Sequence, residues 1–148
     1  MSRFVAVFTR ASKLMRATAD AEFGRHGVRV GQNLVLEALW NEDGLTPGQI
    51  ARRLGVSTPT VVKMVTRMEA EGLVTRRRDE TDGRLVRVSA TKRGLAVRGP
   101  IEAALRRLEE RATAGLDDAE RRQFEDALAK MVANLEAVAP PGQNDGVA

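Results

Sequence analysis

The amino-acid sequence predicts a mainly α-helical fold that carries one small β-hairpin. Apolar residues recur with a helical period over most of the 148-residue chain. Two runs rich in β-branched residues, Leu73–Arg78 and Leu85–Ser89, flank a polar loop that contains Asp82-Gly83, a common hairpin turn. The chain has no cysteine and no apolar run near the ~18 residues of a membrane helix. Disulfides, thiolate metal sites and membrane spans are therefore not expected.

The N-terminal segment has the pattern of an amphipathic helix over about residues 2–23. We expect this helix to end near Phe23-Gly24, where glycines begin a short connection. A second helix is predicted from about Gly31 to Asn41. The apolar positions of the first helix are Phe4, Val7, Phe8, Ala11, Leu14 and Met15, and those of the second are Leu34, Val35, Ala38 and Leu39.

The segment from Leu45 to Arg77 predicts two short helices joined by a tight turn. Thr46 can cap the first of them, with Pro47 at its first position and Gln49 completing a capping-box variant. Gly55 can take the positive φ that ends this helix. Ser57 or Thr58 can then cap the second helix, and Pro59 suits its first turn. This arrangement is a helix-turn-helix.

The second of these helices has two different faces. An apolar stripe is predicted to face the core. On the opposite face Thr60, Lys63 and Arg67 carry a hydroxyl, an ammonium and a guanidinium, which are groups that contact phosphates and base edges in a major groove. For an isolated helix, a solvated polar face would be the simpler interpretation. The stripe consists of Val61, Met64, Val65 and Met68.

The predicted hairpin follows this helix, after Gly72, and forms a wing that is rich in arginine. From Ile50 to Arg98 the chain has 12 Lys and Arg against 5 Asp and Glu, a net charge of +7, whereas the remainder has 12 against 15, a net charge of −3. Such a localised basic surface is typical of proteins that bind duplex nucleic acid. Arginine-rich strands can alternatively be solvated edges that resist aggregation.

The C-terminal part predicts two more helices. Thr91 can cap a helix from about Lys92 to Ala114, which we expect to be bent or broken at Gly99-Pro100 because Pro100 lacks a backbone donor. Asp117 and Glu120 predict a capping box for the last helix. Its apolar positions form a seam suited to another helix, namely Phe124, Leu128, Met131, Leu135 and Val138.

In this order of elements the chain resembles the multiple antibiotic resistance regulator (MarR) family of bacterial winged-helix transcription factors, over nearly its whole length. The most specific resemblance is the wing pattern Asp-x-Arg, five residues, Leu-Thr and then Gly. It appears here as Asp82-Gly83-Arg84, Ala90-Thr91 and Gly94, with Ala90 in place of the leucine. Val56 to Val61 resembles the start of the family's recognition helix, and Gln32, Val35, Leu36 and Leu39 match the helix before it.

The resemblance implies one domain over residues 1–139. Residues 140–148 are rich in Pro, Gly, Asn and Asp, and this composition predicts a disordered tail. A winged helix-turn-helix would occupy about 32–93, and dimerisation helices about 2–23 and 95–139. Two copies would then present recognition helices ~34 Å apart to a pseudopalindromic double-stranded DNA operator. The alternative is that the end helices only cover each other within one chain.

The resemblance also implies the residues that contact DNA. Arg84 would enter the minor groove from the wing tip, and Asp82 would hold that arginine by a charge-assisted hydrogen bond. Asp82 can alternatively be a turn-forming residue before Gly83. The full set implied for DNA binding is Ser57, Thr58, Pro59, Thr60, Lys63, Arg67, Arg77, Arg78, Asp82 and Arg84.

Enzyme chemistry has little support in the composition, since the chain has one histidine, no cysteine and no tyrosine. His26 lies in the glycine-rich connection without a predicted partner, so we predict no catalytic residue, no metal site and no cofactor.

The prediction is a cytoplasmic, homodimeric, sequence-specific DNA-binding transcriptional regulator, a repressor released by a small-molecule effector. Ligand response is common in the resembled family, in a cleft between the dimer helices and the winged helix. Trp40 could line such a cleft or pack in the core, and no ligand-binding residue is assigned. The alternative function is a winged-helix module that binds an acidic protein partner and reads no bases.

Overall fold

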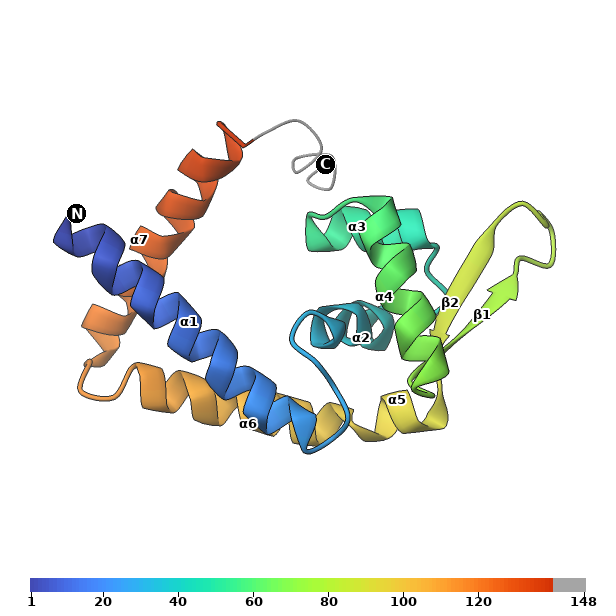
Figure 1. Ribbon diagram of the computed structural model, residues 1–148, viewed down its shortest axis with the longest axis horizontal. Coiled ribbons are helices and arrows are strands. Elements are labelled where there is room, and N and C mark those ends of the chain that lie inside the picture. The colour runs from blue at the N-terminus through green and yellow to red at the C-terminus, as the bar shows by residue number, and fades with distance from the viewer. Residues whose placement is uncertain (140–148) are drawn as a thin grey trace.

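The structure is a computed structural model that describes residues 1–139 (Figure 1). The predicted fold class is confirmed, since the described chain is mostly helical with one antiparallel hairpin. The disordered tail predicted at 140–148 lies outside the described residues. The elements are α1 (Arg3–Gly24), α2 (Gln32–Asn41), α3 (Pro47–Leu54), α4 (Thr58–Ala70), β1 (Val74–Arg78), β2 (Val86–Ala90), α5 (Lys92–Ala96), α6 (Arg98–Ala112) and α7 (Asp118–Glu136).

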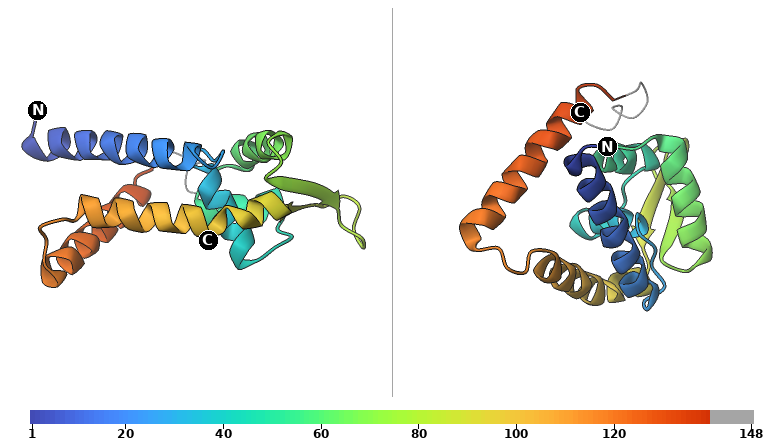
Figure 2. Two further views of the ribbon diagram at one scale, coloured as in Figure 1. Left: turned by 90° about the horizontal axis from the view of Figure 1, so that it is seen from below. Right: turned by 60° about the vertical axis from the view of Figure 1, so that its left-hand side comes forward.

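The molecule has two parts that α5 and α6 connect. Helices α2, α3 and α4 pack together at one end, with the β1–β2 hairpin projecting beside them (Figure 1). At the other end α1 lies alongside α6, as the left view of Figure 2 shows. Helix α7 turns back from the end of α6 (Figure 1). The helix-turn-helix and its hairpin therefore form one part of the molecule, and the terminal helices form the other.

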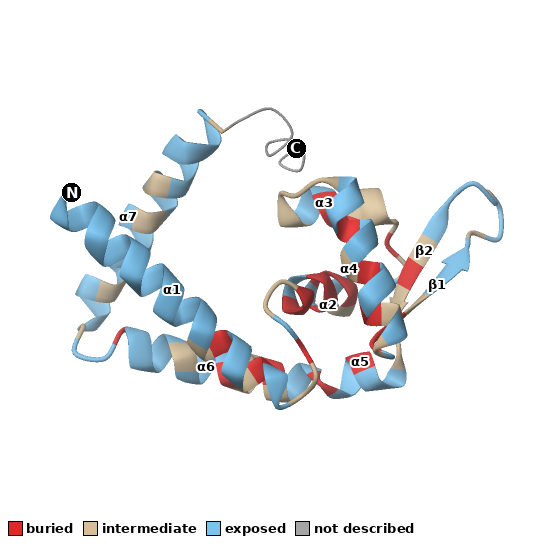
Figure 3. Cartoon of the chain, in the orientation of Figure 1, coloured by how far each residue is buried: buried red, intermediate tan, exposed pale blue. Residues whose placement is uncertain are grey.

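The hydrophobic core lies mainly between α2, α3, α4 and the base of the hairpin (Figure 3). Val61, Val65 and Met68 are fully buried, which confirms the apolar stripe predicted for α4, and Met64 packs against the same core. The core extends to the C-terminal end of α1 and to the first turns of α6 through Ala19, Phe23, Ile101 and Ala104. The largest of the other fully buried side chains are Phe23, Leu36, Leu39, Ile50, Leu73 and Ile101.

Local capping explains where the short helices begin and end. Thr46 and Gln49 form the predicted capping box of α3, and Gly55 ends that helix with φ +68°. Ser57 rather than Thr58 caps α4 through its side chain. Asp117 and Glu120 form the predicted capping box of α7. These side chains satisfy backbone N–H groups that have no partner inside the helix.

The hairpin pairs Val74 with Ala90 and Arg78 with Val86 in antiparallel register. β1 starts one residue later than predicted and ends at Arg78 as predicted, whereas β2 starts and ends one residue later than predicted. Leu73 is buried but donates its backbone N–H to the Met68 carbonyl, so it closes α4 instead of starting β1. Leu45, just before α3, bridges to Val88 of β2. The base of the wing is thereby joined to the helix-turn-helix.

The predicted break at Gly99-Pro100 is wrong by about one turn. Helix α5 ends at Ala96 and α6 begins at Arg98, so the interruption falls at Val97. Pro100 cannot donate a hydrogen bond to the carbonyl of Ala96, four residues earlier, and the ring crowds that carbonyl. Pro100 itself lies in the first turn of α6, where a backbone N–H is not needed.

The apolar seam of α7 is only partly covered by the rest of the described chain, with Leu128 and Met131 half-buried and the other seam positions exposed. No residue of Asp118–Glu136 is buried, and Phe124 and Leu135 are 50% and 57% exposed. Val138, predicted as the last seam position, follows the end of the helix and is 77% exposed. The interpretation in which the end helices only cover each other within one chain therefore does not account for this seam. Within residues 1–139, no helix is long and apolar enough to cross a bilayer.

Candidate nucleic-acid interface

The polar residues predicted for α4 lie at its N-terminal end and on its solvent side. Thr58, Pro59, Thr60, Lys63 and Arg67 are exposed, whereas the cap residue before them is half-buried. The free backbone N–H groups and the positive end of the helix dipole are also at this end. An anion such as a phosphate is favoured at such a terminus.

Several of these side chains already have partners within the chain. Ser57 Oγ accepts the backbone N–H of Thr60 at 3.3 Å and lies 2.8 Å from Thr60 Oγ1. Arg67 Nε lies 3.3 Å from Glu71 Oε1, one helical turn away. Lys63 makes no hydrogen bond or ion pair with any residue in 1–139, so its ammonium is available to an external anion.

The first arginine of the wing, Arg76, serves the fold. Its guanidinium contacts Glu69 Oε1 at 2.9 Å and donates to Thr66 Oγ1 at 3.3 Å, both on α4. Its backbone N–H also donates to Glu69 Oε2 at 3.1 Å. The Arg76 contacts lower the pKa of Glu69 below its ordinary value. This pair fixes the angle between α4 and β1, which sets where the wing lies.

Arg77 and Arg78 continue along β1 and are exposed. Arg78 Nη1 donates to the carbonyl of Gly83 at 3.4 Å across the loop. The Arg77 side chain makes no hydrogen bond or ion pair with any other described residue, although the Arg77 backbone pairs with Arg87 in the ladder. Together they place positive charge on the outer part of the wing.

The predicted contact between Asp82 and Arg84 is present at the wing tip. Arg84 Nε lies 3.1 Å from Asp82 Oδ1, and Arg84 Nη2 lies 3.2 Å from Oδ2. Asp82 Oδ1 also accepts the backbone N–H of Arg84, so Asp82 shapes the turn and holds the arginine. The arginine contacts lower the pKa of Asp82. The Arg84 side chain is 90% exposed, projecting into solvent with its orientation constrained.

Asp79, which the sequence interpretation did not select, organises the whole wing loop. Its Oδ2 accepts the backbone N–H of Thr81 at 3.1 Å, the Thr81 hydroxyl at 2.7 Å and the backbone N–H of Asp82 at 2.9 Å. Its Oδ1 lies 2.5 Å from Arg87 Nε, and Arg87 Nη1 donates to the Gly44 carbonyl at 2.9 Å. These contacts hold the pKa of Asp79 far below its usual range, and the hydrogen bond from Arg87 lowers the pKa most. The sequence did contain a signal for this role. An aspartate at the start of a hairpin loop can accept backbone N–H groups two and three residues later.

Trp40 has a packing role at the junction between the two parts. Its indole Nε1 donates to the Gly94 carbonyl of α5 at 2.9 Å, and the Arg98 guanidinium lies 5.8 Å from the ring centroid. A cavity of about 100 Å³ between α2 and α6 is also lined by Trp40 and Arg98. Within residues 1–139, no group of three or more His, Asp or Glu side chains is placed to hold a metal ion.

Comparison with known proteins identifies a common family. A family model described as MarR family matches residues 26–85. The HTH-type transcriptional regulator TtmR of Methylorubrum extorquens is 34% identical over 132 residues, covering 89% of this chain. The chain spans 66% of that relative, just under two thirds of its length.

Solved structures share the fold over most of the chain. The Staphylococcus aureus MepR–DNA complex has a TM-score of 0.82 and 25% identity, covering 91% of this chain and all of that one. CouR from Rhodococcus jostii RHA1, solved with p-coumaroyl-CoA, has a TM-score of 0.73 and 23% identity, covering 88% and 92% of the two chains. At this level of identity the likeness to CouR concerns the fold alone.

Proposed function

Because the chain belongs to the MarR family, we propose that it is a transcriptional regulator that binds double-stranded DNA as a homodimer. The observation that carries this proposal is the set of exposed cations on α4 and the wing, above all Lys63, Arg77 and Arg84. They lie on the two elements that protrude from a module of net charge +7. The likeness to MepR, which was solved with DNA, supports the same conclusion.

In this proposal α4 enters the major groove and the wing follows the backbone to the minor groove. Ser57, Thr58, Pro59 and Thr60 lie at the helix end that favours a phosphate, and Lys63 and Arg67 lie further along the groove. Arg77 and Arg78 contact the backbone. Arg84, aimed by Asp82, reaches the minor groove, whose negative potential favours arginine.

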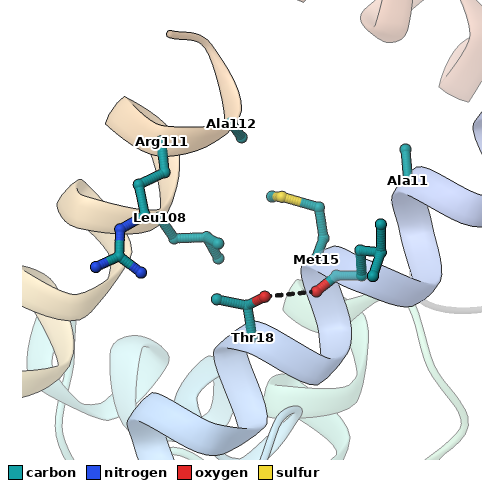
Figure 4. Close-up of a pocket in the computed structure, with 7 residues that line it drawn as sticks. Ala11, Met15, Thr18, Leu108, Arg111 and Ala112 are labelled. Atoms are coloured by element: carbon teal, nitrogen blue, oxygen red, sulfur yellow. Dashed lines mark hydrogen bonds between the residues drawn. The ribbon is translucent and has the colours of Figure 1, made fainter.

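The terminal helices are proposed to join two copies of the chain. Helix α1 and helix α6 leave an open apolar groove with a cavity of about 350 Å³, walled by Leu14, Met15 and Leu108. Figure 4 shows Met15 and Leu108 projecting into it from opposite sides, with Arg111 at its edge. The exposed part of the α7 seam is a matching apolar surface, and burying both against a second copy removes them from water.

The proposed organisation is one domain over residues 1–139. The winged helix-turn-helix spans about 32–93, and the dimerisation helices span about 2–23 and 95–139. Two such modules in one dimer would read a pseudopalindromic site, because each recognition helix meets the same groove one turn apart.

We further propose a cytoplasmic repressor that a small molecule releases from DNA. The CouR structure holds p-coumaroyl-CoA, so this fold accommodates a small ligand in at least that protein. A ligand releases the operator only if it binds the free dimer more tightly than the DNA-bound dimer. Family and fold point to a protein that is not an enzyme, and the proposal assigns this chain no catalytic role.

An electrophoretic shift assay tests the function. A fragment from upstream of the chain's own gene should be shifted at physiological salt by far less protein than a random duplex of equal length. Equal affinity for the two duplexes would favour the other candidate, a module that binds an acidic protein without reading bases. The likeness to a DNA complex disfavours that candidate.

A further inference from the structure

One large apolar side chain on the recognition helix is turned away from the core. Val62 is 40% exposed, whereas Val61 and Val65 on the same helix are completely buried. The core stripe of α4 is therefore complete without Val62. A valine in this position also forms helix less well than alanine would, so helix stability does not explain it.

Val62 lies among the residues that face solvent on α4. Positions 58, 59, 62, 63 and 66 share one side of a helix that turns about 100° per residue. Val62 is therefore one turn after Thr58 and Pro59, directly before Lys63, and one turn before Thr66. All of these residues are exposed.

Of the two threonines one helical turn from Val62, Thr66 is already engaged within the protein. Thr66 Oγ1 donates to the Val62 carbonyl at 2.8 Å and accepts from Arg76 Nη1 at 3.3 Å. Toward the C-terminal end of α4, the surface at Val62 therefore presents hydrocarbon beside the unpaired ammonium of Lys63. A polar base edge gains little from hydrocarbon, whereas an apolar group on a base is favoured there.

The 5-methyl group of thymine is the apolar feature of the major groove, and aliphatic side chains contact it. We propose that Val62 is a specificity-determining residue that contacts the methyl group of a thymine. This inference rests on the proposed function, because it requires α4 to lie in the major groove. It adds a sequence preference that Lys63 and the wing arginines do not supply.

The test uses the full chain and the duplex that it selects from a randomised library. Each thymine of that duplex is replaced in turn by uracil, which lacks only the methyl group. We expect one thymine per half-site at which the replacement weakens wild-type binding about fourfold, the value of one buried methyl contact. Val62→Ala should bind the thymine and uracil duplexes equally, within twofold.

Leu95→Ala is the matched control, since Leu95 is another exposed apolar residue, 57% exposed on α5, outside the recognition helix. This variant should keep the wild-type ratio between the thymine and uracil duplexes. Thermal unfolding of both variants checks that they fold.

Two results would overturn the inference. One is a wild-type protein that is indifferent to every uracil replacement. The other is a Val62→Ala variant that keeps the wild-type ratio. If the wild-type protein selects no sequence at all, the proposed function fails first, before any replacement is made.

Discussion

At the scale of single residues, the wing arginines differ in function although they are alike in sequence. Arg76 and Arg87 are held by Glu69 and Asp79 and serve the fold. Arg77 has no partner among residues 1–139, and Arg84 projects from the tip with only Asp82 beside it. Composition predicted a basic wing, but it could not show which arginines serve the fold, because that depends on the carboxylate each guanidinium contacts, on α4 for Arg76 and in the wing loop for Arg87.

Arg84→Ala should weaken operator binding by roughly 1–3 kcal/mol, because it removes a groove contact whose orientation Asp82 has already fixed. Fluorescence anisotropy with a labelled duplex measures this loss. Arg29→Ala is the control, since Arg29 is an exposed arginine in the connection between α1 and α2, outside the winged module and the dimerisation helices. Equal losses for both variants would mean that only overall charge matters.

Asp79 predicts a specific dependence of stability on pH. Its pKa is lowered in the folded protein, mainly by Arg87, so its contribution to stability is present above the unfolded pKa of about 3.9 and lost as pH falls further. Asp79→Asn should therefore be less stable than the wild type at neutral pH, and the difference should shrink below pH ~4. Chemical denaturation at a series of pH values measures both proteins.

Glu80→Gln provides the control for this measurement, because Glu80 is an exposed carboxylate in the same loop with no described contact. It should follow the wild type at every pH. A constant difference between Asp79→Asn and the wild type down to pH 2 would contradict the role given to the Asp79 carboxylate.

At the scale of elements, local signals predicted the helices well and their junctions less well. Caps such as Thr46 and Asp117 act on neighbouring residues, so the sequence shows them directly. The interruption at Val97 lies before Pro100 because the missing hydrogen bond belongs to a carbonyl four residues earlier. The Trp40 contact with Gly94 joins residues 54 apart, and no local pattern indicates such a partner.

Gly94 is where α5 meets the start of the wing most closely. A Cβ on Gly94 would lie 2.2 Å from the Leu73 carbonyl oxygen, whereas one on Gly99 would meet nothing within 4 Å. Gly94→Ala should therefore destabilise the protein by about 1–3 kcal/mol. Gly99→Ala should stabilise it by about 0.5–1 kcal/mol, because α6 gains a better helix former. Equal melting temperatures for the two variants would contradict the packing described.

At the scale of the whole molecule, charge and apolar surface are separated. The module from Ile50 to Arg98 carries net charge +7, and the terminal helices carry the mostly exposed apolar seam. The sequence predicted this separation because the basic segment and the apolar helical periodicity each extend over many residues. It could not assign partners to the seam, since a helix seam packs equally well within a chain or between chains.

The dimer proposed from that seam predicts the mass in solution. Light scattering at micromolar concentration should give twice the 16.1 kDa mass of one chain. Leu135→Asp, in the exposed seam of α7, should shift the mass toward one chain, since burying an unpaired carboxylate costs several kcal/mol. Leu34→Asp, at an exposed leucine of α2 outside the terminal helices, should remain dimeric. A wild-type mass of one chain would remove the proposed two-fold reading of DNA.

The basic winged module is proposed to read DNA sequence. The most direct test of this proposal is a titration of the wild-type protein against the upstream fragment of its own gene and a random duplex, across a salt series. We expect the upstream fragment to bind about 1,000-fold or more tightly than the random duplex at physiological salt. Affinity should fall by about 10³ to 10⁵ between 50 and 200 mM salt. Equal affinity for the two duplexes, or affinity that salt does not change, would contradict the proposal.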